Sequence, residues 1–235
     1  MRVLLTRPLE DSRAVAGALA PDGIACLIWP LTRIVPVAVA LEIPPGTGGL
    51  LFTSANGVRA FAALAPRRDL PALCVGEASA EAARRAGFGD VRSAAGDARA
   101  LARLAEASGI GRFLHPRGRH ATGDLAGWLA GSGRPVAEAV LYEAVETGPA
   151  PAPIEAALAR GAVGMVTAWS PRAAAILARR LPDLGAELAA TDLLAISAGA
   201  ARPLAGAGFR RSLIAARPDG RSMLAAIRAA ARARK

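Results

Sequence analysis

The chain has 235 residues, of which 53% are hydrophobic but only 4% aromatic, and its formal net charge is +10. This length suits one large or two small domains, with a core built mainly from Ala, Leu, Val and Ile. Cys26 and Cys74 lie in apolar runs without CxxC spacing, and His115 and His120 are the only histidines; this pattern predicts buried free thiols and argues against a zinc or iron site.

Arginine carries nearly all of the positive charge, because Lys235 is the only lysine. Two explanations stay open, a compositional bias and an anionic ligand. The arginines are scattered and do not alternate with aromatic residues, so a small polycarboxylate suits them better than nucleic acid. The apolar N-terminal run is too short for a secretory signal, and no uncharged run reaches the ~20 residues of a membrane helix. We therefore expect a cytoplasmic protein with no membrane or nucleic-acid partner.

In chain order, the first half begins with an apolar strand in RVLLTRP (residues 2–8), followed later by an extended segment from Thr32 to Gly46. Two strand–turn–helix patterns come next, GLLFTSANGVRAF (49–61) and ALCVGEASAEAARRAGF (72–88). A short β-like run and an amphipathic helix in AAGDARALARLA complete this half.

The second half repeats the same elements in the same order. RFLHPRG (112–118), MVTAWSPRAAAIL (165–177) and LLAISAGAARPLAGAGF (193–209) match the three patterns above, and a second extended segment runs from Tyr142 to Pro153. The aligned pairs are Arg7 with Arg117, Leu19 with Leu129, Gly23 with Gly133, Ser54 with Ser170, and Gly87 with Gly208. Gly87 and Gly208 both fall where a helix C-cap is expected.

Strands that alternate with helical patterns predict βα units and parallel sheets. Each half holds three or four such units, so the repeat favours two small sheets over one large sheet. The two extended segments contain proline and β-branched residues, which favours connecting strands over packed helices. We expect them to link two domains.

In open α/β sheets, ligands bind beyond the carboxyl ends of the strands. The turns at these ends are Thr6–Pro8, Thr53–Asn56, Gly76–Ser79, Pro116–Gly118, Ser170–Arg172 and Ser197–Gly199. Each hydroxyl alone is explained as a helix N-cap, but together the free N–H groups, hydroxyls and arginines predict an anion-binding surface. The chain has no GxGxxG, GxxxxGK[ST] or GxSxG motif, which disfavours a nucleotide cofactor and a Ser-His-Asp triad.

The order and spacing of these motifs resemble the uroporphyrinogen-III synthase family over essentially the whole chain. The motifs are VLLTRP, LLFTSANGV, CVGEASA with AGF, RFLHPRG, AVLYEAV, WSPRAA, and AISAGAA with GAGF. The resemblance implies an α/β fold of two flavodoxin-like parallel-sheet domains joined by a two-stranded linker. Domain 1 is then discontinuous, residues 1–33 plus 149–235, domain 2 spans 38–142, and the linkers are 34–37 and 143–148.

The family's activity is implied in the same way. Hydroxymethylbilane, a linear tetrapyrrole with acetate and propionate side chains, is cyclised to uroporphyrinogen III with loss of water and inversion of the terminal pyrrole, without metal or organic cofactor. Tyr142, the only tyrosine, matches the family tyrosine that hydrogen-bonds the departing hydroxyl. We expect it to be catalytic and to face a cleft between the domains; packing on the sheet is the alternative.

The resemblance and the turns together indicate the substrate-binding residues. These are Arg7, Thr53, Ser54, Asn56, Gly76, Ser79, Arg117, Ser170, Pro171 and Ser197. The family pattern Gly-x-x-Thr reads Gly76-Glu77-Ala78-Ser79 in the first copy and loses its last hydroxyl at Ala200 in the second. Each arginine has an ordinary salt bridge as its alternative, and Trp169 suits either a site lining or the core.

We expect a monomer, with room for a transient contact with the preceding enzyme of the pathway. Two other functions stay open. The first is a non-catalytic two-domain binding protein for a small anionic ligand, and the second, less favoured, is a basic nucleic-acid-binding module.

Overall fold

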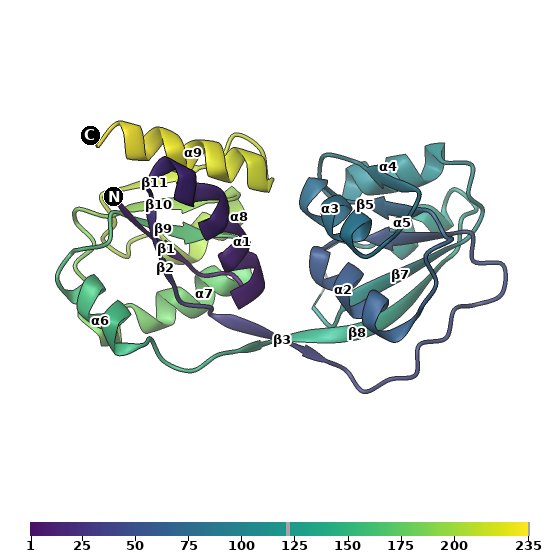
Figure 1. Ribbon diagram of the computed structural model, residues 1–235, viewed down its shortest axis with the longest axis horizontal. Coiled ribbons are helices and arrows are strands. Elements are labelled where there is room, and N and C mark those ends of the chain that lie inside the picture. Colours follow the sequence, from purple (N-terminus) through teal and green to yellow (C-terminus); the bar gives the residue numbers. More distant parts are fainter. Residues whose placement is uncertain (121–122, 235) are drawn as a thin grey trace. The chain divides into compact units, whose positions relative to one another are not determined.

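The computed structural model describes residues 1–120 and 123–234, and the chain divides into two compact units. Unit 1 combines Met1–Arg33 with the segment from Val145 onward, and unit 2 is Ile34–Ala144. Each unit contains one sheet with helices packed on it (Figure 1). Our domain limits from the sequence stay a prediction. Within the described residues, no helix has the length and apolarity needed to cross a membrane.

Unit 1 is built on a five-stranded parallel sheet in the order β11-β10-β9-β1-β2. Its strands are β1 (Arg2–Leu5), β2 (Ala25–Ile28), β9 (Met165–Ala168), β10 (Asp192–Ala195) and β11 (Arg211–Ile214). Its helices are α1 (Leu9–Leu19), α6 (Ala152–Ala159), α7 (Pro171–Arg180), α8 (Ala198–Ala201) and α9 (Gly220–Arg232), with 3-10 turns η1 (Ala20–Asp22), η2 (Pro182–Leu184) and η3 (Arg202–Leu204). Counted along the unit, the strands lie in the order 2-1-3-4-5, which is flavodoxin-like.

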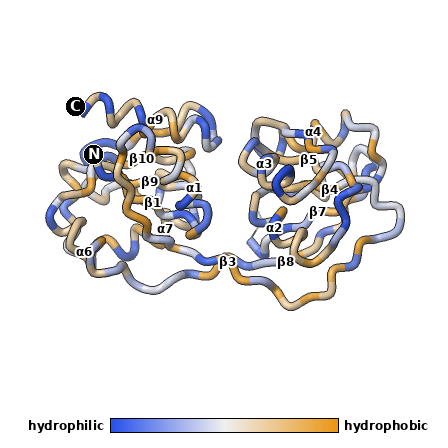
Figure 2. Tube along the Cα trace, viewed as in Figure 1, coloured by the Kyte–Doolittle hydropathy of each residue, from blue (hydrophilic) through white to orange (hydrophobic). Residues whose placement is uncertain are grey.

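Alternate residues of these strands enter two separate cores. Val3 and Leu5 pack with α1 and α9 on one face of the sheet, whereas Leu4 and Val166 pack with α6 and α7 on the other. This is the two-residue period of a strand buried on both faces. In Figure 2, α9 is hydrophilic at both ends, while Met223 and Ile227 in its middle are buried against the sheet.

Unit 2 has a six-stranded sheet in the order β3-β8-β7-β4-β5-β6. Its strands are β3 (Thr32–Pro36), β4 (Gly49–Phe52), β5 (Ala72–Cys74), β6 (Val91–Ser93), β7 (Phe113–Gly118) and β8 (Val136–Glu146). Its helices are α2 (Ala55–Leu64), α3 (Glu77–Arg85), α4 (Ala98–Ala107) and α5 (Leu125–Ala130). If β7 and β8 are counted first, the parallel strands again follow the flavodoxin-like order 2-1-3-4-5.

The strand orders of the two sheets show that the two repeated halves of the sequence exchange strands. Strand β1 from the first half pairs with β9 from the second, and β7 from the second half pairs with β4 from the first. Each half therefore gives its first βα unit to the sheet of the other half. The predicted fold class, two flavodoxin-like parallel sheets with a discontinuous first domain, is confirmed.

Strands β3 and β8 form the two-stranded connection. Val37 N donates to Leu141 O at 2.9 Å, and Thr147 N donates to Leu31 O at 3.1 Å, so the two segments run antiparallel. One part of the predicted second extended segment is wrong. The segment from Tyr142 to Pro153 is not extended throughout, because α6 begins at Ala152; proline in the first helical turn is well tolerated.

The repeated helices after β5 and β10 differ in length. Helix α3 is followed by Gly87, whose φ of 91° and N–H bond to Arg84 O complete a helix C-terminus. The alignment predicts the same role for Gly208, and this prediction is wrong, because α8 ends at Ala201 and η3 at Leu204. Pro203 stands where the first copy has Ala82, and proline cannot continue an α-helix.

Candidate active site

The strand order singles out one position in each sheet. In a flavodoxin-like sheet, ligands bind beyond the carboxyl ends of the strands, where the strand order reverses. This switch point lies between β1 and β9 in unit 1 and between β7 and β4 in unit 2. Arg7, Ser170 and Ser54 lie in the turns that follow β1, β9 and β4. Arg117 lies within β7 itself, so the turn predicted at Pro116–Gly118 is wrong.

In unit 2, Tyr142 lies in β8 and joins the turn after β4. Its hydroxyl is 2.7 Å from Ser54 Oγ, and both side chains are half-buried. Ser54 Oγ also accepts the N–H of Gly57 at 3.1 Å, which makes Ser54 the N-cap of α2. Ser54 therefore both orients the phenol of Tyr142 and caps the N-terminus of α2.

Two glycines allow this arrangement. A Cβ atom on Gly118 would lie 2.7 Å from Cε2 of the Tyr142 ring, and a Cβ atom on Gly57 would lie 2.7 Å from Pro116 O. Real Cβ atoms do not come this close, so any side chain at either position must displace the ring or the helix. The end of β7 and the start of α2 are thus in direct contact beside Tyr142.

The neighbouring hydroxyl belongs to a second network. Thr53 Oγ1 is 3.1 Å from Nε2 of His115, a β7 residue that is only 1% exposed. On its other side, His115 Nδ1 lies 3.5 Å from Glu138 Oε1, and Arg117 Nη2 lies 3.0 Å from Glu138 Oε2. Burial lowers the pKa of His115 to about 4; Glu138 opposes this shift and Arg117 adds to it. The imidazole is therefore neutral at pH 7.

Unit 1 places different side chains at its switch point. Arg7 donates from Nη2 to Asp11 Oδ2 at 3.0 Å, and its guanidinium carbon lies 4.6 Å from the centroid of a Trp169 ring. Ser170 caps α7 by accepting the N–H of Ala173 at 3.1 Å, and Pro171 is the first residue of that helix. Both arginines expected to bind substrate, Arg7 and Arg117, thus have carboxylate partners.

The other expected binding residues lie at helix N-termini. Gly76 is the N-cap of α3, and Ser197 caps α8 by accepting the N–H of Ala200 at 3.3 Å. Asn56 lies in the first turn of α2, where Oδ1 accepts from Arg59 Nη2 at 2.6 Å. Ser79 differs from the rest, because it is 4% exposed within α3. Unlike the other hydroxyls, it does not lie at the surface of the turn.

Sequence reasoning missed three residues of unit 2. Gly118 was considered only as part of a turn, and neither Glu138 nor the role of His115 was recognised. The repeat carried a usable signal for His115, because the aligned residue of the first half is Leu5. A histidine in place of a buried leucine is a local exception to the apolar pattern, and such exceptions concentrate at functional sites.

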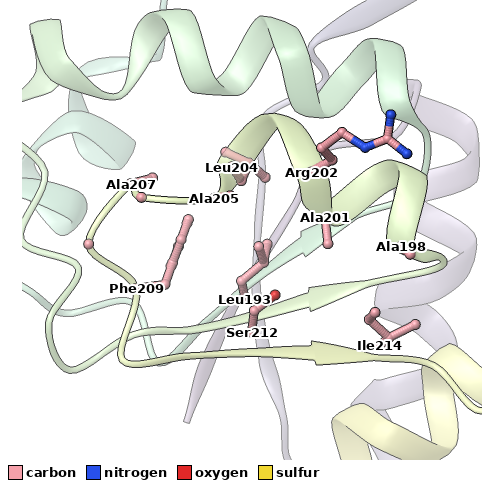
Figure 3. A pocket seen from close by; sticks show the side chains of 12 residues that line it. Leu193, Ala198, Ala201, Arg202, Leu204, Ala205, Ala207, Phe209, Ser212 and Ile214 are labelled. Carbon is pink, nitrogen blue, oxygen red and sulfur yellow. The ribbon is translucent and has the colours of Figure 1, made fainter.

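A hollow of about 610 Å³ lies elsewhere in unit 1, beside the shortened helix α8 and η3 (Figure 3). Small and apolar residues, Leu193, Leu204 and Phe209 among them, make up most of its lining, and Arg202 and Ser212 are its charged and polar members. None of the candidate site residues predicted from the sequence contributes to this lining. Within residues 1–120 and 123–234, no group of three or more His, Cys, Asp or Glu side chains is placed to hold a metal ion.

Comparison with known proteins identifies the family. The family model described as Uroporphyrinogen-III synthase HemD matches residues 13–225. The solved uroporphyrinogen-III synthetase of Helicobacter pylori 26695 is 18% identical, with a TM-score of 0.62 over 96% of this chain and 97% of that one. A mutant uroporphyrinogen III synthase of the extremely thermophilic bacterium Thermus thermophilus is 21% identical, with a TM-score of 0.51 over 99% of each chain.

At these identities the solved structures support the fold, whereas the family match carries the assignment. Comparison with curated proteins gave no match. The non-catalytic binding protein that the sequence left open is not favoured by the family match. Because that match spans most of the residues, the chain belongs to the uroporphyrinogen-III synthase family, whose members are cyclising lyases acting on a tetrapyrrole.

Proposed function

We propose that this chain cyclises hydroxymethylbilane to uroporphyrinogen III, with loss of one water molecule and inversion of the terminal pyrrole, and that Tyr142 assists the loss of the hydroxyl. The observation that carries the role of Tyr142 is its 2.7 Å hydrogen bond to Ser54 at the switch point of unit 2. This bond places the phenol oxygen at the turn after β4, where ligands of such a sheet bind.

The chemistry asks little acid–base work of the protein. The nitrogen of the hydroxymethylpyrrole pushes out the hydroxyl group, which takes up a proton and leaves as water, and an electrophilic azafulvene remains. Ring closure then restores the pyrrole and releases a proton. A phenol hydrogen bond to the departing oxygen stabilises the charge that develops there without adding negative charge beside substrate carboxylates. Such help contributes about 10²-fold, and positioning of the chain supplies most of the rest.

Ser54 supports Tyr142 in this role. If Ser54 Oγ–H donates to the phenol oxygen, the phenol hydrogen is not used on Ser54, and we propose that the phenol donates it to the departing hydroxyl of the substrate. The serine oxygen keeps its bond from the Gly57 N–H in this arrangement, because a hydroxyl accepts and donates at the same time. Ser54 is thus a positioning residue for Tyr142.

The acetate and propionate groups of the substrate need positive partners. Arg7 and Arg117 are 24% and 22% exposed and are held by Asp11 and Glu138, so each guanidinium is oriented and still reaches the surface. The N-termini of α2 and α7 offer backbone N–H groups at Asn56 and at Ser170, whereas Pro171, which has no N–H, begins α7 and can contact the substrate only through its ring. Gly76 and Ser197 complete the proposed contacts of the two turns after β5 and β10. The predicted contact at Ser79 is proposed to be indirect, because its side chain is buried and its N–H binds Gly76 O at 3.1 Å.

The enzyme is proposed to act as a cytoplasmic monomer without metal or organic cofactor, meeting the preceding enzyme of the pathway only transiently. Full activity after exhaustive chelation and dialysis is the expected result for the cofactor. Activity that is lost and then restored by one added metal would contradict it.

Incubation of the purified chain with freshly made hydroxymethylbilane tests the proposed function. We expect the type III isomer, because the enzyme holds the terminal pyrrole in the inverting geometry. A binding protein without catalysis leaves the substrate to close spontaneously to the type I isomer. Separation of the two isomers by chromatography distinguishes these outcomes.

A further inference from the structure

The buried imidazole of His115 takes no part in the proposed chemistry. Its side chain is 2% exposed, and its Nε2 contacts Thr53 Oγ1 at 3.1 Å. Its Nδ1 has no hydrogen-bond partner in the described residues, and the nearest charged oxygen is Glu138 Oε1 at 3.5 Å. Burial of a polar ring costs free energy unless its nitrogens are satisfied. The burial of the His115 imidazole is therefore costly for folding, and a functional role would explain it.

Unit 1 shows that the fold does not need this histidine. Leu5 aligns with His115, and Leu5 pairs with Ile28 in the same register in which His115 pairs with Glu138. Trp169 precedes Ser170 as Thr53 precedes Ser54. Leu5, Ile28 and Trp169 pack in one apolar cluster. The same three positions thus form an apolar core in unit 1 and a polar network in unit 2.

The charge of Glu138 selects the tautomer of the neutral ring. A hydrogen on Nδ1 faces the carboxylate and is attracted by it. A hydrogen on Nε2 would instead leave the Nδ1 lone pair facing a negative charge, which is repulsive. The ring therefore carries its hydrogen on Nδ1, and Nε2 accepts a hydrogen bond. Thr53 supplies that bond, because its Oγ1 is the atom within 3.1 Å of Nε2.

The tautomer of His115 determines whether Thr53 Oγ1 donates or accepts a hydrogen bond with a ligand. A hydroxyl has one hydrogen, and here that hydrogen points inward to His115. Only the lone pairs of Oγ1 face outward from this half-buried side chain. A carboxylate, which only accepts, does not match them. A pyrrole N–H, which only donates, does.

We propose that His115 is a positioning residue which, held by Glu138, presents Thr53 Oγ1 as a hydrogen-bond acceptor for a pyrrole N–H of the linear tetrapyrrole. The identity of the substrate rests on the proposed function. Thr53 thereby binds the N–H of a pyrrole ring, whereas Arg7 and Arg117 bind the carboxylate side chains of the substrate. In this role Thr53 orients one ring of the substrate, and the backbone turn that it occupies also places Ser54 beside Tyr142.

The tautomer is measured on the ligand-free wild-type protein by long-range ¹H–¹⁵N NMR at pH 7. His115 and His120 are the only histidines, so His120→Gln assigns the signals. We expect a neutral His115 with its hydrogen on Nδ1. A hydrogen on Nε2, or a charged ring, would overturn the proposal. This measurement needs no substrate and is independent of the proposed function.

Kinetics with hydroxymethylbilane test the ligand. Thr53→Val and His115→Leu are each expected to raise KM by about 3- to 10-fold, the range of one neutral hydrogen bond, with little change in kcat. Because His115 acts through Thr53, the double variant should resemble Thr53→Val alone. Effects that multiply in the double variant, or that fall on kcat, would overturn the proposal.

Stability is the matched control. His115→Leu/Glu138→Ile copies the Leu5–Ile28 pair of unit 1 into unit 2, so it should fold even if His115→Leu alone does not. It should raise KM at least as much as His115→Leu, because Arg117 also loses its partner. A normal KM in this folded variant would overturn the proposal. If the wild-type protein forms only the type I isomer, the proposed function fails and the pyrrole ligand with it, while the NMR result still decides the polarity of Thr53.

Discussion

Asp192 of unit 1 and His115 of unit 2 are both deeply buried, and they lie toward opposite ends of their sheets. In unit 1, Asp192 is the first residue of β10 and is fully buried. Arg210 Nε and Nη2 donate to its two carboxylate oxygens at 2.8 Å each, and Arg211 adds bonds of 3.1 and 3.2 Å. In unit 2, His115 lies beside Thr53, the first residue after the carboxyl end of β4.

The contrast between the Asp192 cluster and the His115 network distinguishes a structural network from a candidate ligand-binding one. At the amino end of the unit 1 sheet, the Asp192 carboxylate is held by arginines of this chain, so the cluster is closed. At the carboxyl end of the unit 2 sheet, Nδ1 of His115 lies near Glu138 without a hydrogen bond in the described residues, and Thr53 is still half-exposed. A closed network stabilises a fold, and an open one at a switch point is available to a ligand.

The largest expected effect tests the structural end of this comparison. Asp192→Ala should lower the free energy of unfolding by about 3 kcal/mol, because neighbouring guanidinium groups lose their common acceptor. Asp90→Ala is the control, since Asp90 pairs with Arg92 at the surface, where both side chains are 42% exposed, and should cost less than about 1 kcal/mol. Urea denaturation of both variants makes the measurement. Equal losses would show that the Asp192 cluster contributes no more than a surface pair.

The next effect concerns the pH dependence of stability at His115. Burial lowers its folded pKa to about 4, with Glu138 opposing and Arg117 adding to the shift, and the unfolded value is about 6.5. The unfolded chain therefore binds more protons between these values, and stability falls as the pH drops from about 6.5 to 4.

The expected loss is on the order of 3 kcal/mol relative to His115→Leu, which lacks the group. Urea denaturation of wild type and variant at pH 7 and pH 4.5 measures it. Asp192 behaves with the opposite sign. Burial alone would raise its pKa, but Arg210 and Arg211 lower it to about 2, so its stabilisation is lost only as the pH falls through that value. Parallel curves for wild type and His115→Leu would contradict the prediction.

Tyr142→Phe should lower kcat by about 10²-fold while the melting temperature changes little. The pyrrole nitrogen drives the departure of the hydroxyl, so the loss is partial. The phenylalanine ring should occupy the same position, because Gly118 has no Cβ and so leaves room for Cε2, an atom that phenylalanine also has. Steady-state kinetics with hydroxymethylbilane and thermal unfolding make the two measurements. Wild-type turnover in a normally folded variant would leave Tyr142 as a packing residue only.

Much of the fold was predictable because the repeat places equivalent strands in equivalent order. The apolar runs, the turns and the pairing of Arg7 with Arg117 were enough to predict two parallel sheets. The helix after β10 was not predicted correctly. Local similarity across 17 aligned residues, 193–209 against 72–88, outweighed the one substitution, Pro203 for Ala82, that decides the helix length.

The site was predictable only in part, for a physical reason. Turn residues such as Ser54 and Ser170 follow from strand ends, but the partner of a side chain depends on strand register. Glu138 opposes His115, and Tyr142 opposes Gly118 after a register shift in β7 and β8. This irregularity brings the phenol to Ser54, and no spacing rule in the sequence reveals it.

The smallest effect separates the two duties of Ser54. Ser54→Ala removes the N-cap of α2, which should cost about 1 kcal/mol of stability, and the hydrogen bond to Tyr142, which should lower kcat by about 3- to 10-fold. Asp97→Ala is the matched control in the same unit. Asp97 caps α4 by accepting the N–H of Ala100 at 2.9 Å, so this variant should lose similar stability while kcat stays at the wild-type value.

A double variant then decides whether Ser54 acts through the phenol. In the Tyr142→Phe background the serine has no phenol to orient, so adding Ser54→Ala should lower kcat no further, although it should still cost the capping energy. Ser170 caps α7 in unit 1 by the same geometry, with Ala173 N at 3.1 Å, so the capping role of Ser54 does not by itself require a tyrosine beside the serine. A further fall in kcat in the double variant would mean that Ser54 touches the substrate itself, and Tyr142 would then share its role with the serine.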